Sequence, residues 1–337
     1  PTSMPWGGCD RTHLPHAIRT ETTPPMTTHA TGPLAGLTWL KRGINLGRHN
    51  ARAVFGAAAI MMFVALLPSV LQLIVLSIFK PGPNGTMIVA AGANLLSIVI
   101  LSPFMGGFLR LIDATEHARP ASAGDIFQPL RHGGDAGRLI GFGLLMTLYY
   151  VIIGVALLTV FGDGLMDWMT KVMTLQQAAG ETPIDPSQMP AAPEGLGSLL
   201  GLGSILFLFL SGVYAIGFGQ VALGGRPVRQ AMADGVIGTA KNLLPILLLA
   251  VLLVLASIPI GLVLMVVMGI VSVVGGAIHP IVAGALLLPL YLALMIVLYV
   301  VMFGVMYYLW RDVCGPADAQ GGVPPAPSNS NSHQIEL

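Results

Sequence analysis

A long run without any charged residue most constrains how this chain can fold. Residues 53–79 contain only apolar and uncharged polar side chains. A helix of about 20 apolar residues crosses the hydrocarbon core of a bilayer, which is about 30 Å thick. Backbone amides cannot stay unpaired inside lipid, so such a run adopts a helix there. Residues 53–79 are therefore predicted to form a transmembrane helix.

The same pattern recurs along the chain and predicts its fold class. Five further apolar runs have no Asp, Glu, Lys or Arg in their interiors, and they occupy about 87–109, 139–161, 196–223, 243–274 and 281–310. Only 9% of all residues are charged, whereas a soluble domain carries about 25%. The sequence thus predicts an all-α, polytopic membrane helical bundle with six transmembrane helices over residues 36–312. The polar ends, residues 1–35 and 313–337, are predicted to be disordered.

A basic segment precedes every second span. The first such segment, residues 36–50, is predicted to be a short amphipathic helix. Leu37, Leu40 and Ile44 fall on one side of it, which Trp39 and Leu46 extend, and its basic residues fall on the other. Comparable segments precede the third and fifth spans, so we expect three helical hairpins, each preceded by a cytoplasmic amphipathic helix. Basic loops also arise from the requirements of membrane insertion alone, so both origins of the pattern stay open.

The basic residues also predict an orientation. All of the 16 lysines and arginines except Lys80 and Lys171 fall on one side of the predicted spans. Cytoplasmic loops carry an excess of lysine and arginine, so this side is expected to face the cytoplasm. An even number of spans places both termini on that same side. The sequence predicts a bacterial inner-membrane protein with both termini in the cytoplasm.

The sequence lacks the common motifs of catalytic and metal-binding sites. Cys9 and Cys314 lack the spacing of a zinc site, and the chain contains neither His-Glu-x-x-His nor Gly-x-Ser-x-Gly. Ionisable residues inside spans mark proton relays and substrate paths, and the predicted span interiors have none. The formal net charge of +1 gives no sign of a nucleic-acid partner. We therefore expect a non-enzyme without catalytic, cofactor or metal sites and without a nucleic-acid partner.

Three basic residues of the first segment are candidates for lipid binding. A lysine or arginine near an anionic leaflet contributes about 1 kcal/mol to binding. Lys41, Arg42 and Arg48 are therefore predicted to contact lipid headgroups. The alternative is that these residues only anchor and orient the protein.

Small residues predict where helices pack closely. Inside lipid, helices associate through van der Waals contact between backbones that approach each other. The predicted fourth span carries small residues at four-residue spacing, at Gly197, Gly201, Ser211, Ala215 and Gly219. We expect this face to pack against other helices, although a chain rich in glycine and alanine also produces such spacings by chance.

Two amide side chains within the predicted spans, Asn94 and Gln220, are candidate polar contacts near the bilayer midplane. Asn94 is expected to bond to a neighbouring helix, because an unpaired amide is costly in lipid. Contact with a substrate is the alternative for both residues.

Short motifs carry a resemblance to a known family. These are Trp39-Leu-Lys-Arg-Gly43 before the first span, Pro103-Phe-Met-Gly-Gly107 in the second, and Ala240-Lys-Asn242 before the fifth. In their order, the chain resembles uncharacterised bacterial six-helix inner-membrane proteins of the domain-of-unknown-function type. It is also similar to the membrane domain found with some glycerophosphodiester phosphodiesterases. The resemblance implies six helices in the bacterial inner membrane and no established activity, and it supplies no catalytic residues.

Two functions fit these observations. The first is a non-enzymatic envelope protein that interacts with membrane lipid, a partner membrane protein or a second copy of itself. The second is a transporter or permease for a small or lipidic molecule, which the repeat and the prolines within the spans suggest. A transporter would need a polar cavity near the midplane that reaches Asn94 or Gln220.

Overall fold

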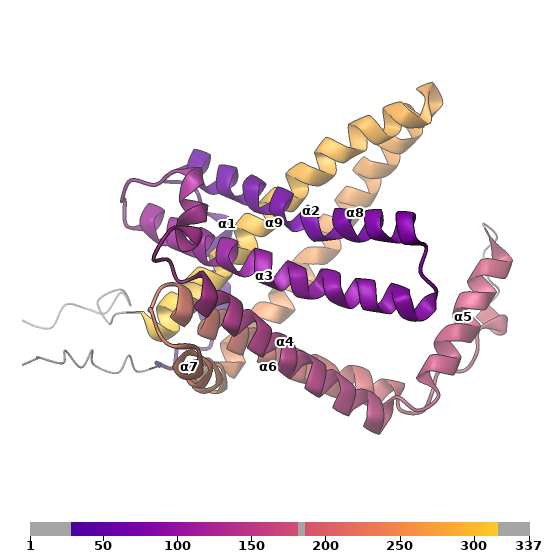
Figure 1. The fold of residues 1–337 in the computed structure, drawn as a ribbon, viewed down its shortest axis with the longest axis horizontal. Helices are drawn as coiled ribbons and strands as arrows, with labels where there is room; N and C mark the ends of the chain where they lie inside the picture. Colours follow the sequence, from indigo (N-terminus) through magenta and orange to yellow (C-terminus); the bar gives the residue numbers. More distant parts are fainter. Residues whose placement is uncertain (1–27, 181–185, 316–337) are drawn as a thin grey trace, which may run out of the picture.

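The computed structural model describes residues 28–180 and 186–315. These residues form helices and connecting loops, with no strand among them (Figure 1). The elements are α1 (Ala35–Ile44), α2 (Ala51–Phe79), α3 (Pro83–Glu116), η1 (Ala123–Leu130, a 3-10 helix), α4 (Ala136–Phe161), α5 (Leu165–Ala179), η2 (Pro186–Gln188, also 3-10), α6 (Leu196–Ala222), α7 (Val228–Lys241), α8 (Leu243–Ile278) and α9 (Pro280–Cys314).

Six of these helices are long and apolar enough to cross a membrane, which confirms the predicted all-α bundle of six spans. They are α2, α3, α4, α6, α8 and α9, and each exceeds the roughly 20 residues that a bilayer requires. Several helices continue beyond the predicted apolar runs. For example, α3 extends through Arg110 and Asp113 to Glu116. Hydropathy detects only the apolar part of a helix, whereas packing and polar contacts stabilise the turns beyond it.

The six spans form three hairpins in a pseudo-threefold arrangement. The hairpins are α2–α3, α4–α6 and α8–α9, and the second helices α3, α6 and α9 contact one another as an inner set. Each first helix packs on the inner helix of the preceding hairpin: α4 on α3, α8 on α6, and α2 on α9. The first helices begin at equivalent N-cap residues, Asn50, Asp135 and Asn242. The first hairpin therefore closes the ring against the last.

The elements that precede the hairpins, α1, η1 and α7, also pack on the preceding hairpin. All three lie at one end of the bundle, which we call the packed end (Figure 1). Element α1 packs on α8 and α9, η1 packs on α2 and α3, and α7 packs mainly on α6. Each therefore contacts the hairpin before the one that it introduces. At the opposite end, which we call the open end, α5 lies beyond the spans.

Glycines of the inner helices make this docking close. A Cβ atom at Gly107 of α3 would lie 2.0 Å from the carbonyl oxygen of Ile126 in η1. A Cβ at Gly304 of α9 would lie 2.9 Å from the Cα atom of Gly43 in α1. Gly217 of α6 approaches α7 in the same way. At these three positions a side chain would separate the two elements.

The packing of α1 agrees with most of the predicted apolar side of this segment and corrects the prediction at Ile44. The predicted apolar side includes Ile44, which is 60% exposed. Trp39 and Leu46, which are predicted to lie on that side, are buried. The buried side also carries Gly36 and Gly43, which face α8 and α9. Two glycines allow the backbone of α1 to approach both helices, and this gain in contact outweighs the burial of a larger aliphatic side chain.

Residues 28–34 also differ from the prediction of a disordered N-terminal region. The side-chain oxygen of Asn242 accepts hydrogen bonds from the backbone N–H of Thr31 at 2.7 Å and from its hydroxyl at 2.8 Å. The Asn242 amide donates to the carbonyl of His29 at 2.9 Å, and the His29 N–H donates to the carbonyl of Val313 at 2.8 Å. This segment is therefore fixed between the start of α8 and the end of α9. Residues 1–27 and 316–337 lie outside the described residues.

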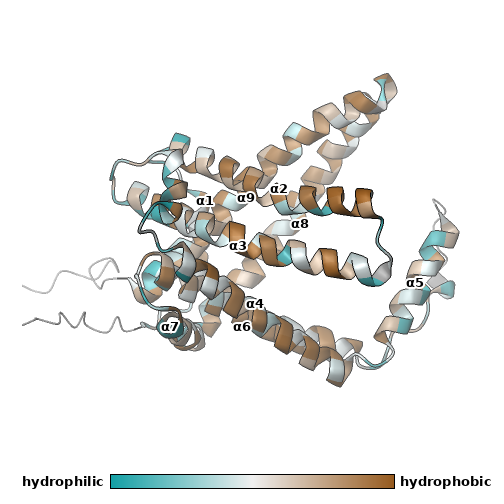
Figure 2. Cartoon of the chain, viewed as in Figure 1, coloured by the Kyte–Doolittle hydropathy of each residue, from teal (hydrophilic) through white to brown (hydrophobic). Residues whose placement is uncertain are grey.

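Buried side chains gather at the packed end, whereas the spans separate toward the open end. Phe108, Phe142, Phe218 and Tyr307 come from four different spans and are fully buried in one core. Large apolar side chains near the open end are exposed, as Val273 illustrates at 73%. Figure 2 shows hydrophobic residues along the spans and more hydrophilic ones on α5. Exposed apolar surface of this kind is stable in a lipid environment.

Candidate functional site

Polar side chains at the packed end connect the spans to the loops. The Asp312 carboxylate accepts hydrogen bonds from the Trp39 indole at 3.0 Å and from Arg42 at 3.3 Å. Asp113 accepts one from the Tyr307 hydroxyl at 2.9 Å and also pairs with Arg119. Asp113 and Tyr307 are 194 positions apart, so no local sequence pattern indicates this contact. These contacts join α1, α3 and α9 and have a structural role.

The three residues predicted to contact lipid headgroups have different environments in the structure. Arg42 is committed to Asp312, and its guanidinium carbon lies 5.6 Å from the centre of the Tyr308 ring. The Arg42 side chain is still 42% exposed, so its contact with a headgroup stays a prediction. Lys41 is exposed on the opposite side of α1 from the buried Trp39 and Gly43, and Arg48 is exposed in the turn that follows α1. Of the three candidates, these two are the more exposed.

The predicted packing stripe of α6 divides into two parts. A Cβ at Gly219 would lie 2.5 Å from the ring of Trp310 in α9, and Ser211 and Ala215 are half-buried. Gly197 and Gly201 are exposed, with no atom within 4 Å of an added Cβ. The expected close packing is therefore absent at these two glycines within one chain, because α6 has already separated from its neighbours there.

Asn94 and Gln220 do not form a midplane site. The Asn94 amide is exposed and donates to the carbonyl of Ala90, one turn earlier in its own helix, at 2.8 Å. The expectation that it bonds to a neighbouring helix is wrong, because its own helix satisfies it. Gln220 is fully buried, but it lies two residues before the end of α6. There it bonds to Asp234 at 2.8 Å and to the Trp310 indole at 3.3 Å.

An apolar crevice lies where the inner helices begin to separate. It has a volume of about 300 Å³ and is lined from α3, α4, α6, α8 and α9. Its lining includes Met105, Tyr150, Ala215, Ala250 and Met306, one residue from each of these helices. The crevice thus reaches all three hairpins. Sequence reasoning missed it, because the lining residues have the same composition as residues that face lipid.

Three hydroxyls line the crevice, on Tyr150, Ser211 and Tyr214, and two of them have partners within the protein. The Ser211 hydroxyl donates to the carbonyl of Phe207 at 2.8 Å, within its own helix. The Tyr214 hydroxyl lies 3.5 Å from the sulfur of Met105. No Asp, Glu, Lys or Arg is among the residues that line this crevice. The crevice therefore suits an apolar group without charge.

A second apolar space, which we call the outer groove, lies on the outside of the bundle between α6 and α8. Its volume is about 730 Å³, and its lining comes from these two helices alone. It shares Leu208 and Ala250 with the crevice. The outer groove and the inner crevice therefore meet at these two side chains.

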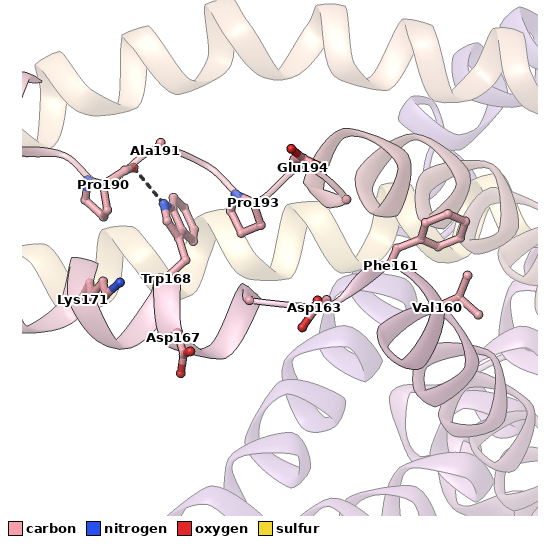
Figure 3. Close-up of a pocket in the computed structure, with 12 residues that line it drawn as sticks. Val160, Phe161, Asp163, Asp167, Trp168, Lys171, Pro190, Ala191, Pro193 and Glu194 are labelled. Atoms are coloured by element: carbon pink, nitrogen blue, oxygen red, sulfur yellow. Dashed lines mark hydrogen bonds between the residues drawn. The ribbon is translucent and has the colours of Figure 1, made fainter.

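A polar hollow of about 550 Å³ lies at the open end, between α5 and the segment before α6 (Figure 3). The Trp168 indole donates to the carbonyl of Pro190 at 3.0 Å and fixes that segment to α5. Asp163, Asp167 and Glu194 line the hollow together with Lys171. In Figure 3 these charged side chains point in different directions and do not converge on a common point.

Metal-binding chemistry is not indicated by the described part of the chain. Within it, no three His, Cys, Asp or Glu side chains are grouped so that they would hold a metal ion.

No protein-family model matches the sequence, and neither a curated protein nor a solved structure matches it. The resemblance to uncharacterised bacterial inner-membrane proteins thus stays a prediction from short motifs.

Proposed function

We propose that this chain is a non-enzymatic integral protein of the bacterial inner membrane that interacts with membrane lipid. The apolar crevice carries this proposal. Its walls come from all three hairpins, its lining carries no charged residue, and two of its three hydroxyls, on Ser211 and Tyr214, have partners within the protein. In a bilayer the apolar molecules that surround such an opening are lipids, so an acyl chain is the ligand class that fits.

The exposed basic residues at the packed end support a cytoplasmic orientation of this end. Lys41 and Arg48 are exposed there, beside the exposed apolar side chain of Ile44. Basic residues next to apolar ones fit the boundary between headgroups and acyl chains, where each contributes about 1 kcal/mol at an anionic surface. We therefore propose that the packed end and both termini face the cytoplasm.

A transporter is less well supported. Neither Asn94 nor Gln220 lines the crevice or the outer groove. A polar solute would have to leave water without any replacement for its hydrogen bonds, which is costly. Association with a partner membrane protein or a second copy stays a prediction, and the exposed Gly197 and Gly201 provide a face for it.

Native mass spectrometry of the purified protein tests the proposal. Wild-type protein is expected to retain bound phospholipid. Ala215→Phe, which places a ring in the crevice, should retain much less. The matched control is Ala156→Phe, because Ala156 is exposed on α4 and does not line the crevice. Wild-type protein without any lipid, or equal retention in both variants, would contradict lipid binding in the crevice. Masses of a dimer or a mixed complex would reveal a protein partner.

A further inference from the structure

We infer that a membrane lipid inserts one acyl chain into the crevice sideways, through the seam between α6 and α8. This inference rests on the proposed function, since it specifies how the lipid reaches its site. The outer groove forms the entrance and the crevice holds the end of the chain. Leu208 and Ala250, which line both spaces, form the neck between them.

Comparison of the three hairpins identifies this seam as the open one. Met61, Met146 and Leu253 occupy the same position after the N-caps of α2, α4 and α8. The two methionines are 2% and 1% exposed, whereas Leu253 is 44% exposed. The pseudo-threefold arrangement is therefore broken at α8, which leaves its neighbour earlier than α2 and α4 do.

The position three residues earlier shows the same difference. Ala58 of α2 and Gly143 of α4 are buried, whereas Ala250 of α8 is only half-buried. A Cβ at Gly143 would lie 2.6 Å from the hydroxyl of Ser102 in α3, so the α3–α4 seam is closed at this level. The half-buried Ala250 instead faces both spaces. Only a small side chain separates the groove from the crevice here.

The chemistry of the groove favours an acyl chain over other occupants. Its lining is apolar, and the one hydroxyl that we find in it, on Ser204, donates to the carbonyl of Leu200 at 2.7 Å. A helix of a partner protein is about 10–12 Å wide with its side chains. Such a helix could cover the groove, but it could not enter a crevice of about 300 Å³. A single hydrocarbon chain is thin enough to occupy both spaces.

The depth of the neck agrees with this occupant. Ala250 and Leu253 follow the N-cap of α8 by two to three turns, which places them about 12–17 Å along the helix at 1.5 Å per residue. The crevice therefore lies at the level of the acyl chains of a bilayer, well inside the headgroup layer.

Photo-crosslinking tests the entrance. The full chain is reconstituted into vesicles of phosphatidylethanolamine and phosphatidylglycerol with a trace of phosphatidylcholine that carries a diazirine in one acyl chain. Crosslinked peptides are then located by mass spectrometry. In wild-type protein we expect crosslinks on the crevice face of α9 around Met306 and on the outer face of α4 around Val155, which is 55% exposed. Ala250→Trp should reduce the Met306 crosslinks at least tenfold and leave those at Val155 unchanged.

Two variants accompany this experiment. Ala156→Trp, on the outer face of α4, is the matched control and should leave the Met306 crosslinks unchanged. Val254→Trp fills the outer groove away from the neck, because Val254 lines the groove but not the crevice and is 63% exposed. It is read in place of Ala250→Trp if that variant does not elute as a single species, and the same loss at Met306 is expected.

The outcomes separate this inference from the proposed function. Undiminished Met306 crosslinks in the blocked variants would show that the chain enters elsewhere and would overturn the inference alone. Wild-type protein without crosslinks at Met306 would also overturn it, even if native spectra retain lipid. Native spectra without any lipid would remove the proposed function itself.

Discussion

Substitution of Gly107 by alanine tests how the packed end is held together. The added Cβ would lie 2.0 Å from the carbonyl oxygen of Ile126, 2.7 Å from its carbonyl carbon and 3.0 Å from its Cα atom. Ordinary van der Waals contact begins at 3.4 Å. The backbone of η1 must therefore withdraw from α3 by the difference, about 1.4 Å, because an alanine side chain cannot move aside.

The magnitude follows from two opposing effects. Replacing glycine by alanine within a helix contributes about 1 kcal/mol of stability through helix propensity. Overpacking of a tight contact costs about 1–3 kcal/mol. Withdrawal of η1 also exposes part of Ile126, which is fully buried, and complete burial of such a side chain contributes about 1.5–3 kcal/mol. We expect Gly107→Ala to lower the free energy of unfolding by about 1–3 kcal/mol.

Gly92 supplies the matched control, since it lies in the same helix with no atom within 4 Å of an added Cβ. Gly92→Ala should leave stability unchanged or raise it by up to about 1 kcal/mol. Unfolding by SDS titration measures both variants, and hydrogen exchange measures η1 locally. Faster exchange of the η1 amides is expected only in Gly107→Ala. Equal or higher stability of Gly107→Ala would refute the idea that this glycine sets the distance between α3 and η1.

Two further predictions concern the N-terminal segment and the orientation. Asn242→Ala removes the acceptor of the Thr31 N–H and the donor to the His29 carbonyl, and each group left unpaired costs about 1–3 kcal/mol. Residues 28–34 should then exchange hydrogen much faster, and unchanged exchange would show that Asn242 does not hold them. A reporter enzyme that is active only outside the cytoplasm should be active when inserted after Gly180 and inactive when fused after Gly315. The reverse result would contradict the proposed orientation.

The sequence was sufficient for the spans because their signal is local. A charge-free run of about 20 residues matches the thickness of the bilayer wherever it occurs, and the basic segment before every second run groups the runs into hairpins. Polar residues such as Asn50 and Asn242, which begin the first helices, are equally local signals. Prediction was less accurate at the ends of the spans, where α3 continues to Glu116. There the helix is stabilised by partners that lie elsewhere in the chain.

The candidate site depended on tertiary structure. Ala250 and Leu253 have the same apolar character as residues that face lipid, so only the divergence of α8 from α6 identifies them as part of a groove and a crevice. Asp312, the partner of Arg42, lies 270 positions away, so only the tertiary structure identifies this pair.

Local sequence therefore determined which segments cross the membrane, because length and hydropathy are properties of one segment. The tertiary structure alone decided which faces of those segments meet. A glycine such as Gly43 signals a close contact only when the surface opposite it, here Gly304, is known. Packing energy depends on the fit of two surfaces, and neither surface carries that information by itself.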